Sequence, residues 1–78
     1  MIVKIYSTPV CPYCHTLGEF FKEKGIAFED IDVSKDEKIR DDMIKRSGQM
    51  GVPVVEIDGQ MIVGFDREKI LKLLNIQE

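Results

Sequence analysis

The sequence predicts an α/β domain with the element order βαβαββα, in which a four-stranded mixed sheet carries helices on both faces. Three observations lead to this fold class. Two short strand-like runs, residues 2–6 and 28–33, are each followed by a segment in which apolar residues recur every three or four positions. Two further apolar runs are joined by Asp58-Gly59, which is the strongest local signal for a hairpin. A crossover through a helix makes two strands parallel and a hairpin makes them antiparallel, so the sheet is mixed.

The first strand and the first helix are predicted from residues 2–24. Residues 2–6 are mostly β-branched or aromatic, and Ser7-Thr8-Pro9 ends the run as a loop, which indicates a buried strand. A helix is predicted over residues 12–24, with Gly25 at the position that follows a helix end. Its apolar face is formed by Cys14, Leu17, Phe20 and Phe21.

A second strand and helix follow. Apolar residues alternate with acids over residues 28–33, which is typical of a strand with one face buried more deeply. Ser34 and Glu37 have the spacing of a capping box, so Ser34 is predicted as the N-cap of the next helix, and Gly48 is predicted to end it. This helix offers only a narrow apolar face, made of Ile39, Met43 and Ile44.

The remaining elements are a hairpin and a last helix. Residues 52–57 and 60–63 are predicted as the two strands of the hairpin, because a two-residue type I′ turn suits Asp58-Gly59. Asp66 is the predicted N-cap of the last helix. The apolar face of this helix contains Ile70, Leu71, Leu73 and Leu74.

Length and composition indicate one domain over residues 1–78, expected to act as a monomer. The net charge of −3 argues against nucleic acid as a partner, because non-specific binding to phosphates needs clustered Lys and Arg. No apolar run is long enough to cross a bilayer or to form a secretory signal, so the expected location is the cytoplasm and no membrane partner is expected. In that compartment a pair of cysteines three residues apart is typical of catalysis or metal binding.

The two cysteines flank a turn in the motif Cys11-Pro12-Tyr13-Cys14. Pro12 suits the first helical position, which places Cys11 at the N-cap, where free N–H groups and the helix dipole favour a thiolate. A reactive Cys11 and a more buried, slower Cys14 are therefore expected. No metal site is expected, because structural zinc needs four ligands and the chain offers two thiols and His15. His15 itself is expected to be exposed.

With these elements in place, the sequence resembles the glutaredoxin family, within the thioredoxin-like fold, over nearly its whole length. Three motifs in the family's order carry the resemblance. They are Cys11-Pro12-Tyr13-Cys14, Gly51-Val52-Pro53 before the third strand, and Gly64-Phe65-Asp66 before the last helix.

The resemblance implies a dithiol thiol–disulfide oxidoreductase, an electron carrier with no bound cofactor. Cys11 and Cys14 would be the catalytic residues, with Pro12 supporting their turn. The Val52-Pro53 bond would be cis, with the backbone of Val52 facing the cysteines. The predicted substrate-binding residues are Tyr13, Val52, Pro53, Gly64, Phe65 and Asp66. Each of three of these residues also has a purely structural interpretation. Tyr13 could be a packing aromatic and Phe65 a turn aromatic, and Pro53 could simply start a strand.

Two departures from the family pattern concern the reductant, which would be glutathione or a flavoprotein reductase. Thr8 stands where glutaredoxins commonly have a Lys, and Arg67 stands where they have a second acid. Gly64-Phe65 is instead similar to glutaredoxin-like redoxins that accept electrons from thioredoxin reductase and pass them to ribonucleotide reductase. The expected substrate is a disulfide in a protein or a small thiol. An alternative is a glutathione-dependent iron–sulfur carrier, against which Pro12 counts.

Overall fold

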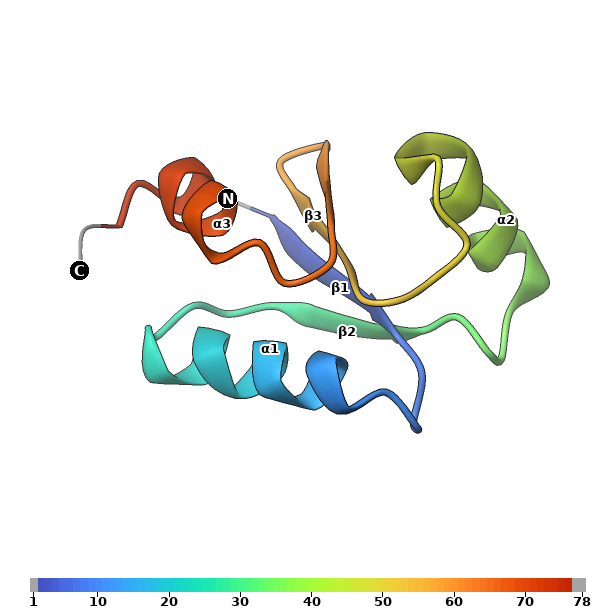
Figure 1. Ribbon diagram of the computed structural model, residues 1–78, viewed down its shortest axis with the longest axis horizontal. Coiled ribbons are helices and arrows are strands. Elements are labelled where there is room, and N and C mark those ends of the chain that lie inside the picture. The colour runs from blue at the N-terminus through green and yellow to red at the C-terminus, as the bar shows by residue number, and fades with distance from the viewer. Residues whose placement is uncertain (1, 77–78) are drawn as a thin grey trace.

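The computed structural model describes residues 2–76 and has the predicted element order. Figure 1 shows α1 along one side of the sheet and α2 at the opposite corner. Strands and helices follow one another as β1 (Val3–Ser7), α1 (Pro12–Glu23), β2 (Glu29–Asp32), α2 (Glu37–Ser47), β3 (Val54–Ile57), β4 (Gln60–Val63) and α3 (Arg67–Leu74).

The strands form one mixed sheet in the order β2-β1-β3-β4. The strands β1 and β2 pair in parallel, whereas β1 with β3 and β3 with β4 pair antiparallel. Asp58 and Gly59 both have positive φ, at 48° and 86°, as the predicted hairpin turn requires. The mixed sheet with helices on both faces is therefore confirmed.

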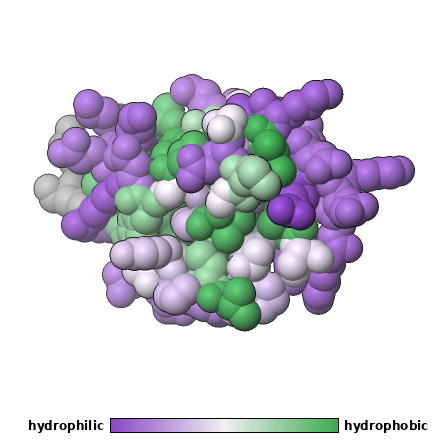
Figure 2. Space-filling view, turned by 45° about the vertical axis from the view of Figure 1, so that its right-hand side comes forward, coloured by the Kyte–Doolittle hydropathy of each residue, from purple (hydrophilic) through white to green (hydrophobic). Residues whose placement is uncertain are grey.

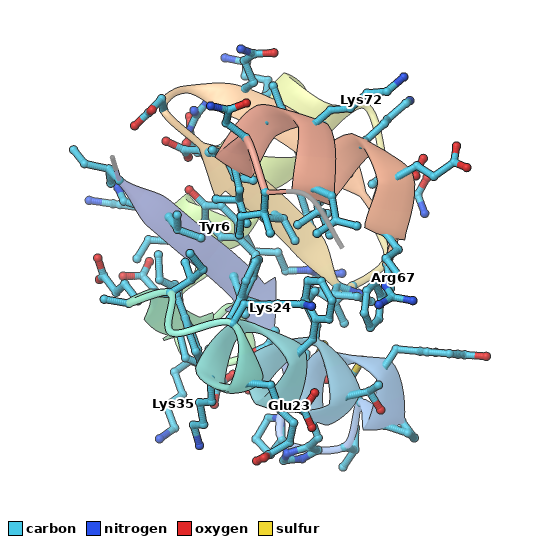
Figure 3. All side chains as sticks on the ribbon, turned by 90° about the vertical axis from the view of Figure 1, so that its left-hand side faces the viewer. Tyr6, Glu23, Lys24, Lys35, Arg67 and Lys72 are labelled. Carbon is cyan, nitrogen blue, oxygen red and sulfur yellow. The ribbon has the colours of Figure 1, made fainter. Side chains whose placement is uncertain are left out.

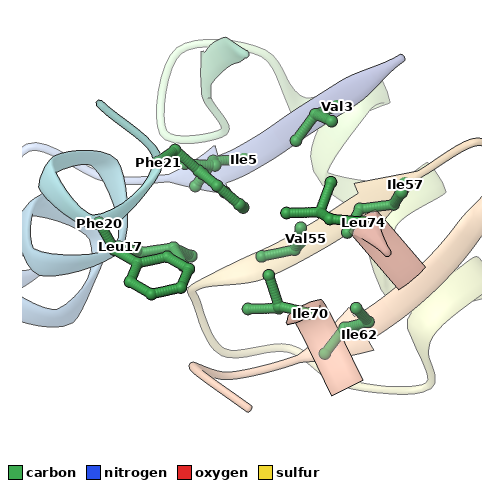
Figure 4. Packing of buried hydrophobic residues seen from close by; sticks show 10 residues of the cluster. All are labelled: Val3, Ile5, Leu17, Phe20, Phe21, Val55, Ile57, Ile62, Ile70 and Leu74. Carbon is green, nitrogen blue, oxygen red and sulfur yellow. The ribbon is translucent and has the colours of Figure 1, made fainter. Parts of the chain in front are cut away.

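The larger core lies between the sheet and the helices α1 and α3. Figure 4 shows Phe20 and Phe21 of α1 and Ile70 of α3 converging on the apolar side chains of the strands. Phe21, Ile5 and Ile70 are at most 1% exposed. This packing fixes the position of α1 on the sheet, and with it the position of the cysteines at the start of the helix.

The opposite face of the sheet, under α2, holds a smaller core with a polar group inside it. Met43 of α2 packs against Tyr6 and Val54, all buried. Glu56 is 8% exposed on the same face, accepts a hydrogen bond of 2.7 Å from the Tyr6 hydroxyl and pairs with Arg46 of α2 at 2.8 Å. Burial and the bond to Glu56 raise the pKa of Tyr6 to about 12. The carboxylate of Glu56 therefore ties α2 to the sheet.

Replacing Glu56 is expected to weaken the fold in a pH-dependent way. The Arg46 guanidinium holds the pKa of Glu56 below its ordinary value, so the stabilisation is complete above the unfolded-state pKa and is lost as the pH falls through the folded-state pKa. In Glu56→Gln the free energy of unfolding at pH 7 should fall by about 1.5–3 kcal/mol. Urea titrations between pH 3 and 7 measure this. The loss should shrink toward pH 3, whereas the same change at exposed Glu23 should have little effect.

The start of α2 corrects one prediction. Asp36, not Ser34, is the N-cap, and its Oδ1 accepts from the N–H groups of Lys38 and Ile39 at 2.9 and 3.2 Å. The competing group is Asp32, whose Oδ1 accepts from both the N–H and the hydroxyl of Ser34. Ser34 is therefore engaged in the preceding turn, and Asp36, the next acidic residue, caps the helix instead.

The ends of the other elements lie close to their predicted positions. Asp66 is the N-cap of α3, with its Oδ1 3.2 Å from the N of Lys69, and Gly48 ends α2 with φ 71°. The strand β3 begins at Val54 rather than residue 52, because Pro53 has no N–H for the ladder. Within residues 2–76 no helix combines the length and the apolar character needed to cross a bilayer.

Candidate active site

Cys11 occupies the N-cap of α1, as predicted. The strand β1 ends at Ser7, a short loop follows, and Pro12 takes the first helical position. The N–H of Cys14 donates to the Sγ of Cys11 across 3.2 Å. Both cysteines are free thiols in this structure. A sulfur at this position receives an N–H bond and the positive end of the helix dipole, both of which stabilise a thiolate.

The two thiols differ in their surroundings more than in their burial. Cys11 is 9% exposed and Cys14 is 7% exposed, so burial barely separates them and the expected difference in exposure is slight. The pKa of Cys14 is raised to about 12, first by burial, then by its hydrogen bond with Cys11, with the nearby charge of Asp30 adding to the shift. A backbone hydrogen bond with Thr8 acts in the opposite direction. In the reduced protein Cys14 is therefore held as a thiol.

Alkylation of the reduced protein should reflect this difference. With iodoacetamide at neutral pH we expect Cys11 to be modified first, because only a thiolate reacts and Cys14 keeps its proton. Tandem mass spectrometry of the tryptic peptide over residues 5–22, which contains both cysteines, locates the label. As a matched pair, Cys14→Ser should be alkylated much faster than Cys11→Ser. Faster labelling of Cys14 would reverse the roles given to the two residues.

The loop before β3 lies next to the cysteine loop. The Val52-Pro53 bond is cis, as predicted, and the Pro53 carbonyl accepts a 2.9 Å bond from the N–H of Gly64. Val52 and Thr8 line one groove, of about 450 Å³, at this end of the molecule. Two of the predicted motifs are therefore hydrogen-bonded to each other, and the groove brings one of them beside the loop that carries Cys11.

Exposed apolar side chains surround this end of the molecule. Tyr13 is 68% exposed, Val10 is 88% exposed and Met50 is 69% exposed. Figure 2 looks toward this side and shows hydrophobic side chains near its centre between polar flanks. Tyr13 is thus available for contact with another molecule, and His15 is exposed as expected, with Nε2 3.4 Å from the Pro9 carbonyl.

The turn before α3 is mainly occupied with packing. The half-buried Phe65 ring meets Phe20 edge-on with 5.3 Å between ring centres. Arg67 extends from α3 toward α1, and its guanidinium lies 5.5 Å from the centre of the Phe20 ring (Figure 3). Asp66 also approaches Lys69 at 4.0 Å. Contacts of Gly64, Phe65 and Asp66 with substrate remain a prediction.

Two features of the site were not predicted. Arg40 and Glu37 of α2 line the groove with Thr8, so a cation is present there despite the missing Lys. Between α1 and β2, Ser7 and Asp30 form a hydrogen bond at a cavity that Cys14 also lines. The alternation of residues along β2 could have indicated this position of Asp30. Ile31 and Val33 pack under α2, so Asp30, which alternates with them, must face α1.

Comparisons with known proteins agree with this geometry. A model of the glutaredoxin family matches residues 3–62. A glutaredoxin-like 8.6 kDa protein in the rubredoxin operon of Clostridium pasteurianum is 49% identical over 94% of this chain and 97% of its own length. Glutaredoxin 3 of Escherichia coli is 41% identical over 82% of this chain and 77% of its own.

A solved structure extends the likeness to the fold. The glutaredoxin-like NrdH-redoxin of Escherichia coli, which has a thioredoxin-like activity profile, superposes with a TM-score of 0.81 at 26% identity. The match covers 94% of this chain and 95% of that one. Together with the thiol pair at the start of α1, these matches show that the chain belongs to the glutaredoxin family of thiol–disulfide oxidoreductases.

Proposed function

We propose that this oxidoreductase is a dithiol electron carrier in which Cys11 attacks the substrate disulfide and Cys14 completes the exchange. The observation that carries the proposal is the N-cap placement of Cys11, whose Sγ accepts the N–H of Cys14 at 3.2 Å. A thiolate is the reactive form in exchange, and this position favours one. The substrate is a disulfide in a protein or a small thiol.

The reaction runs in two displacements. Cys11 thiolate attacks one substrate sulfur, the substrate S–S bond breaks, and the first substrate thiolate leaves with the electron pair. Cys14, after losing its proton, attacks the Sγ of Cys11 and displaces the second substrate thiolate. The two cysteines end as an intramolecular disulfide, and the substrate has gained two electrons and two protons. An external reductant then returns the dithiol.

The groove that Thr8 and Val52 line, next to the loop that carries Cys11, suits an extended substrate. Val52 lies at its edge beside Thr8, and its backbone is suited to pair with the substrate as a short added strand. Tyr13, 68% exposed between the two cysteines, is proposed to contact the bound disulfide. Binding through backbone groups is largely independent of substrate side chains, which suits a carrier with several partners.

Thioredoxin reductase is the electron source that we favour, with ribonucleotide reductase as a recipient. Thr8 brings no charge to the groove, and Arg67 lies over Phe20 where the family has an acid for the γ-glutamyl amine. The thioredoxin-like activity profile of the similar NrdH-redoxin supports the same choice. We propose that the protein acts in the cytoplasm, where protein thiols are kept reduced.

A coupled assay tests the proposed function. Insulin, as a disulfide substrate, is mixed with NADPH, thioredoxin reductase and a catalytic amount of the chain. NADPH consumption should depend on the chain, and the Cys11→Ser variant should give only the background rate. A purified protein that is coloured by an iron–sulfur cluster and inactive toward insulin would favour the alternative role of cluster carrier.

A further inference from the structure

A polar cavity of about 210 Å³ lies on the side of Cys14, between α1 and the end of β2. It shares only Thr8 with the groove that Val52 lines. Cys14 contributes to its wall and Cys11 does not, and Ser7 and Asp30 face it from the strands. The thiol that must act second therefore has a polar compartment of its own.

Asp30 is held at this cavity by a buried partner. It aligns with Ile5 in the parallel pairing of β1 and β2, so it stands on the α1 side of the sheet. Ser7 is 7% exposed and its hydroxyl donates a hydrogen bond to Oδ1 of Asp30. Asp30 itself is exposed. Its carboxylate thus lines the compartment of Cys14 while remaining in contact with solvent.

The second displacement creates a demand for a proton acceptor. In the reduced protein, burial, Cys11 and Asp30 together raise the pKa of Cys14 to about 12. Once Cys11 is bonded to the substrate it carries no charge, so it no longer raises the pKa of Cys14 by charge repulsion. Burial and the negative charge of Asp30 remain. Burial and the charge of Asp30 both oppose a second negative charge beside the first. If Asp30 takes the proton, it becomes neutral as the sulfur of Cys14 becomes negative, so the site never holds two negative charges.

We propose that Asp30, positioned by Ser7, accepts the proton of Cys14 during resolution of the mixed disulfide. The inference rests on the proposed order of Cys11 and Cys14. The S–H bond of Cys14 breaks, the proton passes to the Asp30 carboxylate directly or through cavity water, and the sulfur attacks Cys11 as substrate thiolate leaves. The proton then returns to solvent or to the departing thiolate. The cavity is polar and large enough for water.

Other titratable groups also line the cavity, from both elements. On α1 these are His15, Glu19 and Lys22, and on β2 there is Asp32. His15 faces the Pro9 carbonyl, and Lys22 lies 3.7 Å from Glu19. Asp32 accepts from the N–H and hydroxyl of Ser34, outside the cavity. Among these groups, Asp30 is the acid whose charge acts on the Cys14 thiol.

The test separates the two displacements in one experiment. Reduced protein is mixed in a stopped-flow instrument with one equivalent of 5,5′-dithiobis(2-nitrobenzoate). Attack by Cys11 releases a first thionitrobenzoate and resolution by Cys14 releases a second. In Asp30→Asn the first phase should be unchanged and the second should slow by about 10²-fold at pH 7, within the range of general-base catalysis. That second phase should then rise about tenfold per pH unit, because hydroxide replaces the carboxylate.

Matched variants decide between proton transfer and charge alone. Asp30→Glu should recover much of the second phase, Ser7→Ala should slow it, and Asp32→Asn should leave it unchanged. If Asp30 acted only through its negative charge, Asp30→Asn would speed the second phase. A faster or unchanged second phase in Asp30→Asn therefore overturns the proposal. Release of only one equivalent by the unmodified protein would instead contradict the resolving role of Cys14, and with it the proposed function.

Discussion

The Cys14→Ser variant is expected to stop at a mixed disulfide with its substrate, and Cys11→Ser is expected to be inert. In the proposed mechanism Cys11, at the N-cap of α1, opens the exchange, and a serine at position 14 cannot displace the substrate from it. With a disulfide peptide, Cys14→Ser should gain the mass of one peptide half, located at Cys11. Turnover should be lost in both variants.

The contrast between the two variants is the control. Each removes one small buried thiol, so both should fold alike, and thermal unfolding followed by circular dichroism verifies this. A peptide adduct on Cys14 in Cys11→Ser would contradict the assignment of roles. Equal adducts in both variants would mean that either sulfur reaches the substrate, which the raised pKa of Cys14 argues against.

Turnover through thioredoxin reductase is expected to exceed turnover through glutathione by a large factor. Glutathione carries two carboxylates and an ammonium, and a lost hydrogen bond to a charged group costs about 1.5–3 kcal/mol, which is roughly tenfold to a hundredfold in affinity. Thr8 offers no charge, and Arg67 replaces an acid. Arg40 is the cation that remains in the groove. NADPH consumption with one disulfide substrate compares the two routes.

Charge placement near Thr8 provides the control for this comparison. Thr8→Lys adds a cation inside the groove and should raise the glutathione-driven rate by about tenfold. Thr16→Lys adds the same charge at an exposed position on α1, away from the groove lining, and should change the rate little. Equal rates through the two routes in the unmodified protein, with no gain in Thr8→Lys, would show that other residues bind glutathione.

Local rules predicted the parts of this fold that depend on neighbouring residues. The N-cap of Cys11 followed from Pro12, and the hairpin followed from Asp58-Gly59, because each turn is specified within four residues. The resemblance added the cis bond at Pro53, which spacing alone does not indicate. The capping-box spacing predicted Ser34 as the N-cap of α2, but Asp32 accepts the N–H of Ser34 and Asp36 caps the helix.

Features that depend on sheet register and on distant partners were not predicted. The bond between Tyr6 and Glu56 joins residues fifty positions apart, and nothing in either segment signals the other. Asp30 sits beside Cys14 only because β2 pairs with β1 in one particular register. Shifting that register by one residue would turn Asp30 to the α2 side. The second half of the proposed chemistry therefore depends on tertiary structure.

The most direct test of the dithiol mechanism is the mass of the unmodified protein after reaction with one equivalent of a disulfide peptide. The account predicts complete reduction of the peptide and a protein lighter by two hydrogen atoms. After trypsin, that loss should lie in the peptide over residues 5–22, as a bond between Cys11 and Cys14. A protein that keeps the substrate as a stable adduct, or that keeps both thiols while the peptide stays oxidised, would contradict it.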